Sequence, residues 1–136
     1  MKYFKKYLIS VIAGITAGLI TLFIIPGQYE ILIWLVLIIV LGIIYSKMFQ
    51  QRLFLYAFAF SVLVGIIITI VHLSFVDVYL ENHQDEMATL EDIKIYNSYR
   101  LTLMMIAPVY WLILGILSAF SALLFKKFQI IKVSKM

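Results

Sequence analysis

The sequence predicts an all-α membrane protein with four transmembrane helices, and three observations support this fold class. Of the 136 residues, 65% are hydrophobic and 13% are charged. In soluble domains, about 45–50% of the residues are apolar and about 25% are charged. Four apolar runs are each long enough to cross about 30 Å of hydrocarbon as a helix. The basic residues flank these runs instead of gathering on one soluble surface, so we expect no nucleic-acid binding.

The most apolar run covers residues 53–75 and contains no Asp, Glu, Lys or Arg. Ala57, Ser61 and Gly65 recur at every fourth position, so one face of this helix consists of small side chains. Small faces let helix backbones approach closely in lipid and gain dispersion contacts. We therefore expect this face to contact another helix.

The first span is expected at about residues 8–25, after a basic start with Lys2, Lys5 and Lys6. It resembles a signal peptide, but it is a full span and ends at Pro26-Gly27 without a small-x-small site, so we expect it to stay uncleaved. Gly14 and Gly18 form a GxxxG match that predicts a helix contact.

The second span, about residues 31–46, is nearly pure Leu, Ile and Val and is expected to be the most lipid-exposed helix. The fourth, about residues 101–125, has Ser98 as a predicted N-cap and carries Gly115 and Ala119. We expect it to pack on the 53–75 helix through Gly65 and these two small residues.

Residues 76–100 form the predicted outer segment between the third and fourth spans. Val76, Leu80 and Met87 keep roughly helical spacing, which indicates a partly helical, amphipathic segment at the membrane interface. The segment contains six of the seven acidic residues of the chain: Asp77, Glu81, Asp85, Glu86, Glu91 and Asp92.

The charge distribution predicts a single domain, residues 1–136, with both termini in the cytoplasm. Short loops rich in Lys and Arg stay on the cytoplasmic side of a bacterial inner membrane. All basic residues except Lys94 and Arg100 lie in the N-terminus, the second link or the C-terminal tail: Lys2, Lys5, Lys6, Lys47, Arg52, Lys126, Lys127, Lys132 and Lys135.

His72 is the one titratable residue within a predicted span, which makes it a candidate for proton or ion handling. The alternative is a hydrogen bond between helices near the outer interface. His83 with Asp85 and Glu86 matches no known metal-ligand spacing, so no metal site is predicted. Tyr110-Trp111 could line a pocket for an aromatic or cationic ligand or simply pack.

We expect no enzyme activity and no cofactor. The chain has no Cys and no glycine-rich phosphate loop, and every acidic residue falls in a short segment expected to face solvent. Two function classes follow. The first is an accessory subunit of a larger membrane complex or a homo-oligomer, and the second is a small dimeric transporter or ion-handling protein that uses His72.

The layout also resembles an uncharacterised four-span bacterial inner-membrane family of unknown function, common in the Bacteroidota. The shared features are the basic start, the two close-set spans, the third span running into an acidic, Met-containing segment (Leu80-Glu-Asn-His-Gln-Asp-Glu-Met87), Gly115 in the fourth span and the Lys-ended tail. This resemblance implies a bacterial inner-membrane location and no particular activity.

Overall fold

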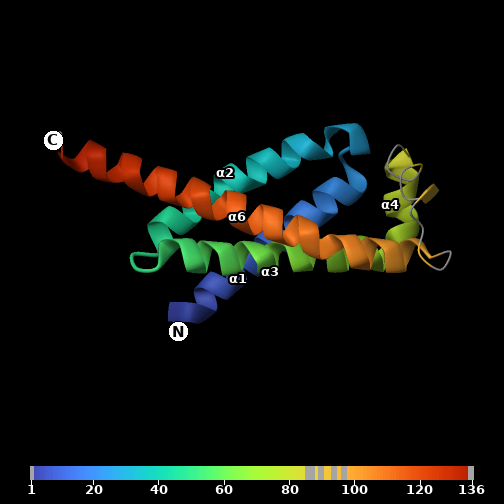
Figure 1. Cartoon of the computed structure of the whole chain (residues 1–136), viewed down its shortest axis with the longest axis horizontal. Helices are drawn as coiled ribbons and strands as arrows, with labels where there is room; N and C mark the ends of the chain where they lie inside the picture. Colours follow the sequence, from blue (N-terminus) through green and yellow to red (C-terminus); the bar gives the residue numbers. More distant parts are fainter. Residues whose placement is uncertain (1, 85–87, 89–90, 93–94, 96–97, 135–136) are drawn as a thin grey trace.

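The structure, a computed structural model, is all-helical over the residues that it describes, which are 2–84, 88, 91–92, 95 and 98–134. Four of its helices are long and apolar enough to cross a membrane, which confirms the predicted fold class at that level. The elements, labelled in Figure 1, are α1 (Lys2–Phe23), η1 (Gly27–Tyr29), α2 (Glu30–Met48), α3 (Leu53–Ser74), α4 (Val76–Asn82) and α6 (Tyr99–Ser134).

Two helices extend well beyond the predicted apolar spans. Helix α1 begins at Lys2, and α6 has 36 residues and continues to Ser134, a length of about 54 Å at a rise of about 1.5 Å per residue. Lys and Gln are good helix formers and need no burial, so the helices continue where the hydrophobic run ends. Hydropathy therefore marks where a chain leaves the apolar layer and not where its helix ends.

Helix α3 lies between α1 and α6 and contacts both through small residues. A methyl group built on Gly14 would lie 2.8 Å from the Ile67 Cβ, and one on Gly18 would lie 3.0 Å from the Val71 Cβ. The distance at Gly14 is too short for a side chain and the one at Gly18 is tighter than most Cβ contacts, so the backbone of α1 packs closely on side chains of α3.

In the contact between α3 and α6, each helix contributes a glycine that lies against side chains of the other. A Cβ on Gly65 of α3 would lie 2.9 Å from the Trp111 Cδ1, and one on Gly115 of α6 would lie 2.9 Å from both Phe58 and Val62. The other small residues singled out in the sequence, Ala57, Ser61 and Ala119, have no exposed surface.

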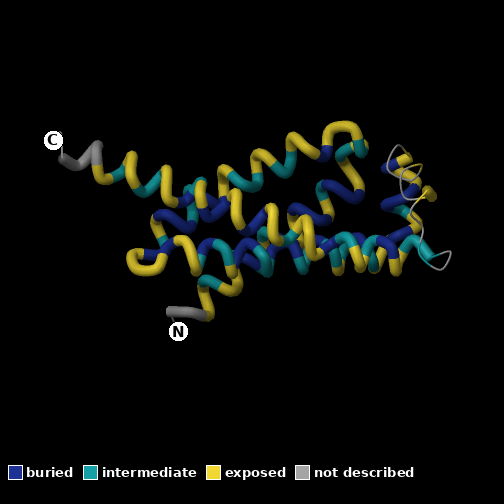
Figure 2. Tube along the Cα trace, in the orientation of Figure 1, coloured by how far each residue is buried: buried dark blue, intermediate teal, exposed yellow. Residues whose placement is uncertain are grey.

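Helix α2 crosses α6 at Gly42, where a Cβ would lie 2.7 Å from the Ser121 Cβ. From this crossing the two helices separate toward the end of α2 that carries Glu30 (Figure 1). Most of α2 outside the crossing is exposed or half-buried (Figure 2), as expected for a helix that faces lipid. Gly42 nevertheless brings α2 into close contact with α6. The Leu, Ile and Val content of α2 did not predict this contact.

Both chain ends and the α2–α3 link lie toward one end of the bundle, and α4 lies at the other (Figure 1). At the first end, the Lys6 Nζ donates to the Met48 carbonyl at 3.2 Å, and the Lys126 Nζ donates to the Gln50 Oε1 at 2.7 Å. We refer to this end as the basic end and to the opposite one as the α4 end.

Helix α4 forms part of the predicted outer segment and folds back on the end of α1. Val76, Tyr79 and Leu80 are buried with Leu22 of α1 in a small apolar cluster, and the Asn82 Nδ2 donates to the Leu22 carbonyl at 2.7 Å. The predicted apolar position Met87 lies outside the described residues. The predicted cap of α6 is confirmed, since the Ser98 Oγ accepts the Leu101 N–H at 3.4 Å.

Candidate functional site: a cavity with a buried carboxylate

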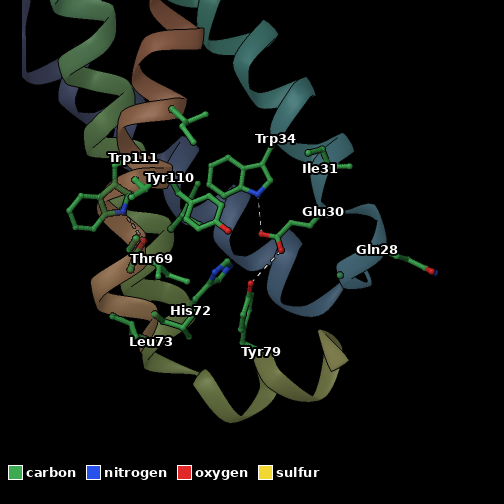
Figure 3. A pocket seen from close by; sticks show the side chains of 17 residues that line it. Gln28, Glu30, Ile31, Trp34, Thr69, His72, Leu73, Tyr79, Tyr110 and Trp111 are labelled. Carbon is green, nitrogen blue, oxygen red and sulfur yellow. Dashed lines mark hydrogen bonds between the residues drawn. The ribbon is translucent and has the colours of Figure 1, made fainter. Parts of the chain in front are cut away.

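A cavity of about 670 Å³ lies at the α4 end, where α2 and α6 have separated. Several of its lining residues are exposed, among them Ile31 of α2 and Val109 and Tyr110 of α6, which indicates that it opens between these two helices. Its volume is within the usual range for small-molecule sites, roughly 300–1,000 Å³. It is lined by Gly27, Gln28, Glu30, Ile31, Trp34, Ile68, Thr69, His72, Leu73, Tyr79, Leu103, Ile106, Ala107, Val109, Tyr110, Trp111 and Ile113 (Figure 3).

Glu30 is the acidic residue of the cavity wall, and it is only 6% exposed. The expectation that every acidic residue faces solvent is therefore wrong for Glu30. The Pro26-Gly27 turn and η1 place it as the first residue of α2, so its side chain turns inward beneath α4. An ionisable group in such a position marks a functional site by default, because an unpaired buried charge is strongly unfavourable.

Three side chains contact the Glu30 carboxylate, and Figure 3 shows two of them, Trp34 and Tyr79. The Trp34 Nε1–H donates to Oε1 at 3.1 Å, and the Tyr79 hydroxyl donates to Oε2 at 3.4 Å. The His83 Nε2 lies 3.2 Å from Oε2, and the His83 side chain has no exposed surface. The contact is an ion pair when His83 carries its second proton. The carboxylate thus connects the start of α2 to the middle of α4 and to His83, the residue that follows α4.

His83 contacts Glu30 without being one of the residues that line the cavity. It lines a second, smaller pocket of about 300 Å³, together with Gln28, Glu81 and Asn82. Its Nδ1 lies 2.9 Å from the Tyr79 carbonyl, which fixes the ring so that Nε2 faces the carboxylate. Glu30 therefore lines the cavity while its Oε2 contacts a histidine that does not line it.

His72 lines the cavity and forms the hydrogen bond between helices that was one of the alternatives for it. Its Nε2 lies 2.8 Å from the Thr21 Oγ1 of α1. Thr21 donates its single hydroxyl hydrogen to the backbone, with the Ala17 carbonyl at 3.0 Å, so the hydroxyl oxygen accepts from the imidazole. No partner of His72 among the described contacts is a carboxylate, although its ring is close to the site.

The rings of His72, Tyr79 and His83 form a continuous stack across the α4 end. Ring centroids are 4.4 Å apart between His72 and Tyr79, and 4.1 Å apart between Tyr79 and His83. Both contacts are close to parallel, at 28° and 18°. The stack packs α4 against α3 and places the Tyr79 hydroxyl at the carboxylate.

Aromatic rings from α2 and α6 form the walls of the cavity. Figure 3 shows Trp34 and Tyr110 close to Glu30, whereas the Trp111 ring lies farther from the carboxylate, beside Thr69. The Trp111 Nε1–H donates to the Thr69 Oγ1 at 2.9 Å, and Thr69 in turn donates to the Gly65 carbonyl at 3.1 Å. Trp34 and Trp111 are the two tryptophans of the chain, and both line this cavity.

The structure brings together residues that the sequence analysis treated separately. His72 and the Tyr110-Trp111 pair meet in one cavity, whereas Glu30, Trp34 and Tyr79 were not singled out. A signal for two of these was available: Glu30 is the one acid outside residues 76–100, and Trp34 follows it by four positions. Residues four apart share a helix face, so Glu30 and Trp34 could have been paired.

The chain was compared with protein-family models, with curated proteins and with solved structures. No match was found. The resemblance to the four-span bacterial family therefore stays a prediction, and the chemistry of the site rests on its residues. Within the described part of the chain, no three His, Cys, Asp or Glu side chains are grouped to hold a metal ion. The arrangement suits a ligand with an apolar or aromatic body and one polar group.

Proposed function

We propose that this chain is a non-catalytic membrane protein that binds a small amphipathic molecule in the cavity at the α4 end, as part of transport or ligand handling. The observation that carries the proposal is the buried Glu30 carboxylate facing an aromatic cavity of about 670 Å³. A protein that only packs against others has no need of a buried acid, which is costly to place among apolar helices.

The use of the small-residue faces also favours ligand binding over a purely accessory role. Gly14 and Gly18 are in contact with α3, Gly65 is in contact with α6, and Gly115 is in contact with α3. These faces were expected to dock on each other or on a larger complex, and within this chain they already contact one another's helices. The cavity is the feature that packing within the chain leaves open.

The proposal is tested with a neutral fluorescent probe, N-phenyl-1-naphthylamine, which accepts excitation energy from tryptophan. Because both tryptophans line the cavity, a bound probe should show saturable energy transfer in the purified protein in lipid nanodiscs. Ala107→Phe places a large ring in the cavity, because Ala107 is a buried lining residue. This variant should lose the saturable component of the energy transfer. Ala59→Phe makes the same change at an exposed position of α3 and should leave it unchanged. Equal, non-saturable transfer in all three proteins would refute the proposal.

We further propose that the protein resides in the bacterial cytoplasmic membrane with the basic end in the cytoplasm and the acidic α4 end outside. The Lys6 and Lys126 contacts, which cluster at the basic end, support this orientation. The chain has no Cys, so Gln28→Cys and Gln50→Cys each introduce a unique thiol at an exposed site. In intact cells, an impermeant maleimide should label the first variant and not the second.

A second candidate function is the accessory one, as a subunit of a larger membrane complex or a homo-oligomer. It is favoured by α6, which projects past the bundle at the basic end (Figure 1), with Phe128 and Ile130 exposed beside Lys127. Light scattering in mild detergent would give the mass of the full chain and of a chain ending at residue 125. A loss of self-association in the short chain would support this candidate, and equal monomeric masses would remove the homo-oligomer.

A further inference from the structure

We propose that the ligand is an organic cation with an aromatic or apolar body, that Glu30 is its counter-charge, and that His83 gives up a proton when the cation binds. This inference deepens the proposed function and rests on it. The experiment below can reject an organic cation as the ligand without rejecting the proposed binding of a small molecule.

The charges of the cavity wall select for a cation. Glu30 is the one acidic residue among the lining side chains, and the wall contains no Lys or Arg. Its other titratable side chains, His72, Tyr79 and Tyr110, are neutral in their ordinary forms near pH 7 or above. A positive group in the cavity would meet a full negative charge in a poorly hydrated space, where such an interaction is strong.

The aromatic walls add to this preference. Trp34, Tyr110 and Trp111 line the cavity from two helices, and Figure 3 shows the Trp34 and Tyr110 rings beside the carboxylate. The face of an aromatic ring is electron-rich and attracts a cation within about 6 Å of its centroid. The same faces accommodate a flat apolar body. An anionic ligand would be repelled by Glu30 and by the ring faces alike.

His83 provides the positive charge that pairs with Glu30 in the absence of ligand. Its Nε2 is 3.2 Å from the carboxylate, and its side chain has no exposed surface. The ligand would come from the cavity, which Glu30 lines and His83 does not, so the two cations need not displace each other. One carboxylate does not compensate two buried positive charges, because the unpaired charge is strongly unfavourable.

Binding of the cation therefore favours neutral His83. The proton leaves the imidazole for water through the smaller pocket, which His83 lines together with exposed residues of η1 and α4. One positive charge enters the site and one leaves, so its total charge is unchanged. The other groups that face this pair are Tyr79 between the two rings, His72 behind Tyr79, and Glu81 at the pocket mouth. The charged residues of the described part of α1, Lys2, Lys5 and Lys6, are at the basic end.

The test uses two probes of the same shape, phenyltrimethylammonium and its neutral carbon isostere tert-butylbenzene. Both are titrated into the full chain in lipid nanodiscs, and the signal is the fluorescence of Trp34 and Trp111. We expect the cation to bind at least about tenfold more tightly than the isostere, the size of effect expected for one buried charge contact. Glu30→Gln should remove this preference, because the amide keeps the shape of the side chain and one oxygen to accept the Trp34 N–H but not the charge.

Two further variants keep the result interpretable. Glu30→Asp retains the charge and should keep the preference for the cation even if the affinity falls. Asp77→Asn removes an exposed carboxylate of α4 and should behave as the wild type. A preference that survives Glu30→Gln would overturn the role of Glu30. Equal saturable binding of both probes would overturn the cation class and leave the proposed function intact, whereas no saturable signal with either would overturn both.

The proton is tested by the pH dependence of cation binding. If His83 releases a proton, the dissociation constant of phenyltrimethylammonium should fall as the pH rises, by up to about tenfold per pH unit while His83 is protonated. His83→Asn should abolish this dependence, and His72→Asn should keep it. A pH dependence that disappears in His72→Asn and persists in His83→Asn would show that His72 releases the proton. That result would overturn the role proposed for His83.

Discussion

The Thr21 Oγ1 lies 2.8 Å from the His72 Nε2 and joins α1 to α3 beside the cavity. The same arrangement occurs once more, where the Thr69 Oγ1 accepts the Trp111 Nε1–H at 2.9 Å and joins α3 to α6. In both cases the threonine gives its own hydrogen to a carbonyl of its own helix and offers its oxygen to a ring on the next. These two hydrogen bonds fix two rings of the cavity wall between helices that are otherwise packed by apolar contacts.

Replacing Thr21 with Val should lower the free energy of unfolding by about 0.5–2 kcal/mol, because it removes the acceptor of the His72 N–H without changing the shape of the side chain. The measurement is unfolding of the purified protein in mixed micelles with increasing SDS. Thr16→Val makes the same chemical change at an exposed position of α1 and should have almost no effect. Equal stability of the two variants would show that the His72 contact contributes nothing.

Replacing Thr69 with Val should change the environment of Trp111, whose N–H would lose its acceptor. The effect can be measured on a Trp34→Phe background, which leaves Trp111 as the one tryptophan of the chain. We expect a shift of its emission maximum and greater quenching by acrylamide, because the ring is released toward the open side of the cavity. An unchanged spectrum and unchanged quenching would mean that apolar packing alone positions the ring.

Replacing Gly42 with Leu should destabilise the fold by about 1–3 kcal/mol, the usual cost of forcing extra volume into a close contact. A side chain at this position meets the Ser121 Cβ at 2.7 Å, so α2 and α6 must move apart. Val36→Leu adds volume to the exposed side of the same helix and serves as the control. We expect a lower SDS unfolding midpoint for Gly42→Leu than for Val36→Leu. Similar midpoints would contradict a tight crossing at Gly42.

The fold was readable from the sequence because it depends on features that are local along the chain. Hydrophobic runs bounded by Pro26-Gly27 and by Lys and Arg define four long helices, and Ser98 marks the start of the last one. The site was only partly readable, because it depends on tertiary contacts. Glu30 was taken for a loop residue, since nothing local shows that α4 folds over it and supplies Tyr79 and His83 from about 50 residues away.

Replacing Asn82 with Ala should loosen α4, because the Asn82 side chain donates to the Leu22 carbonyl at 2.7 Å and ties α4 to the end of α1. Leu22 is fully buried, so its carbonyl would lose a partner, at a cost of about 1 kcal/mol. We expect hydrogen exchange of the α4 amides to become roughly fivefold faster, the factor that corresponds to this free energy. Glu81→Ala, an exposed change on the same turn, should leave the exchange unchanged. Because α4 carries both Tyr79 and His83, its release should also weaken their contacts with Glu30. Exchange rates that match in the two variants would mean that the apolar cluster around Leu22 holds α4 in place without this hydrogen bond.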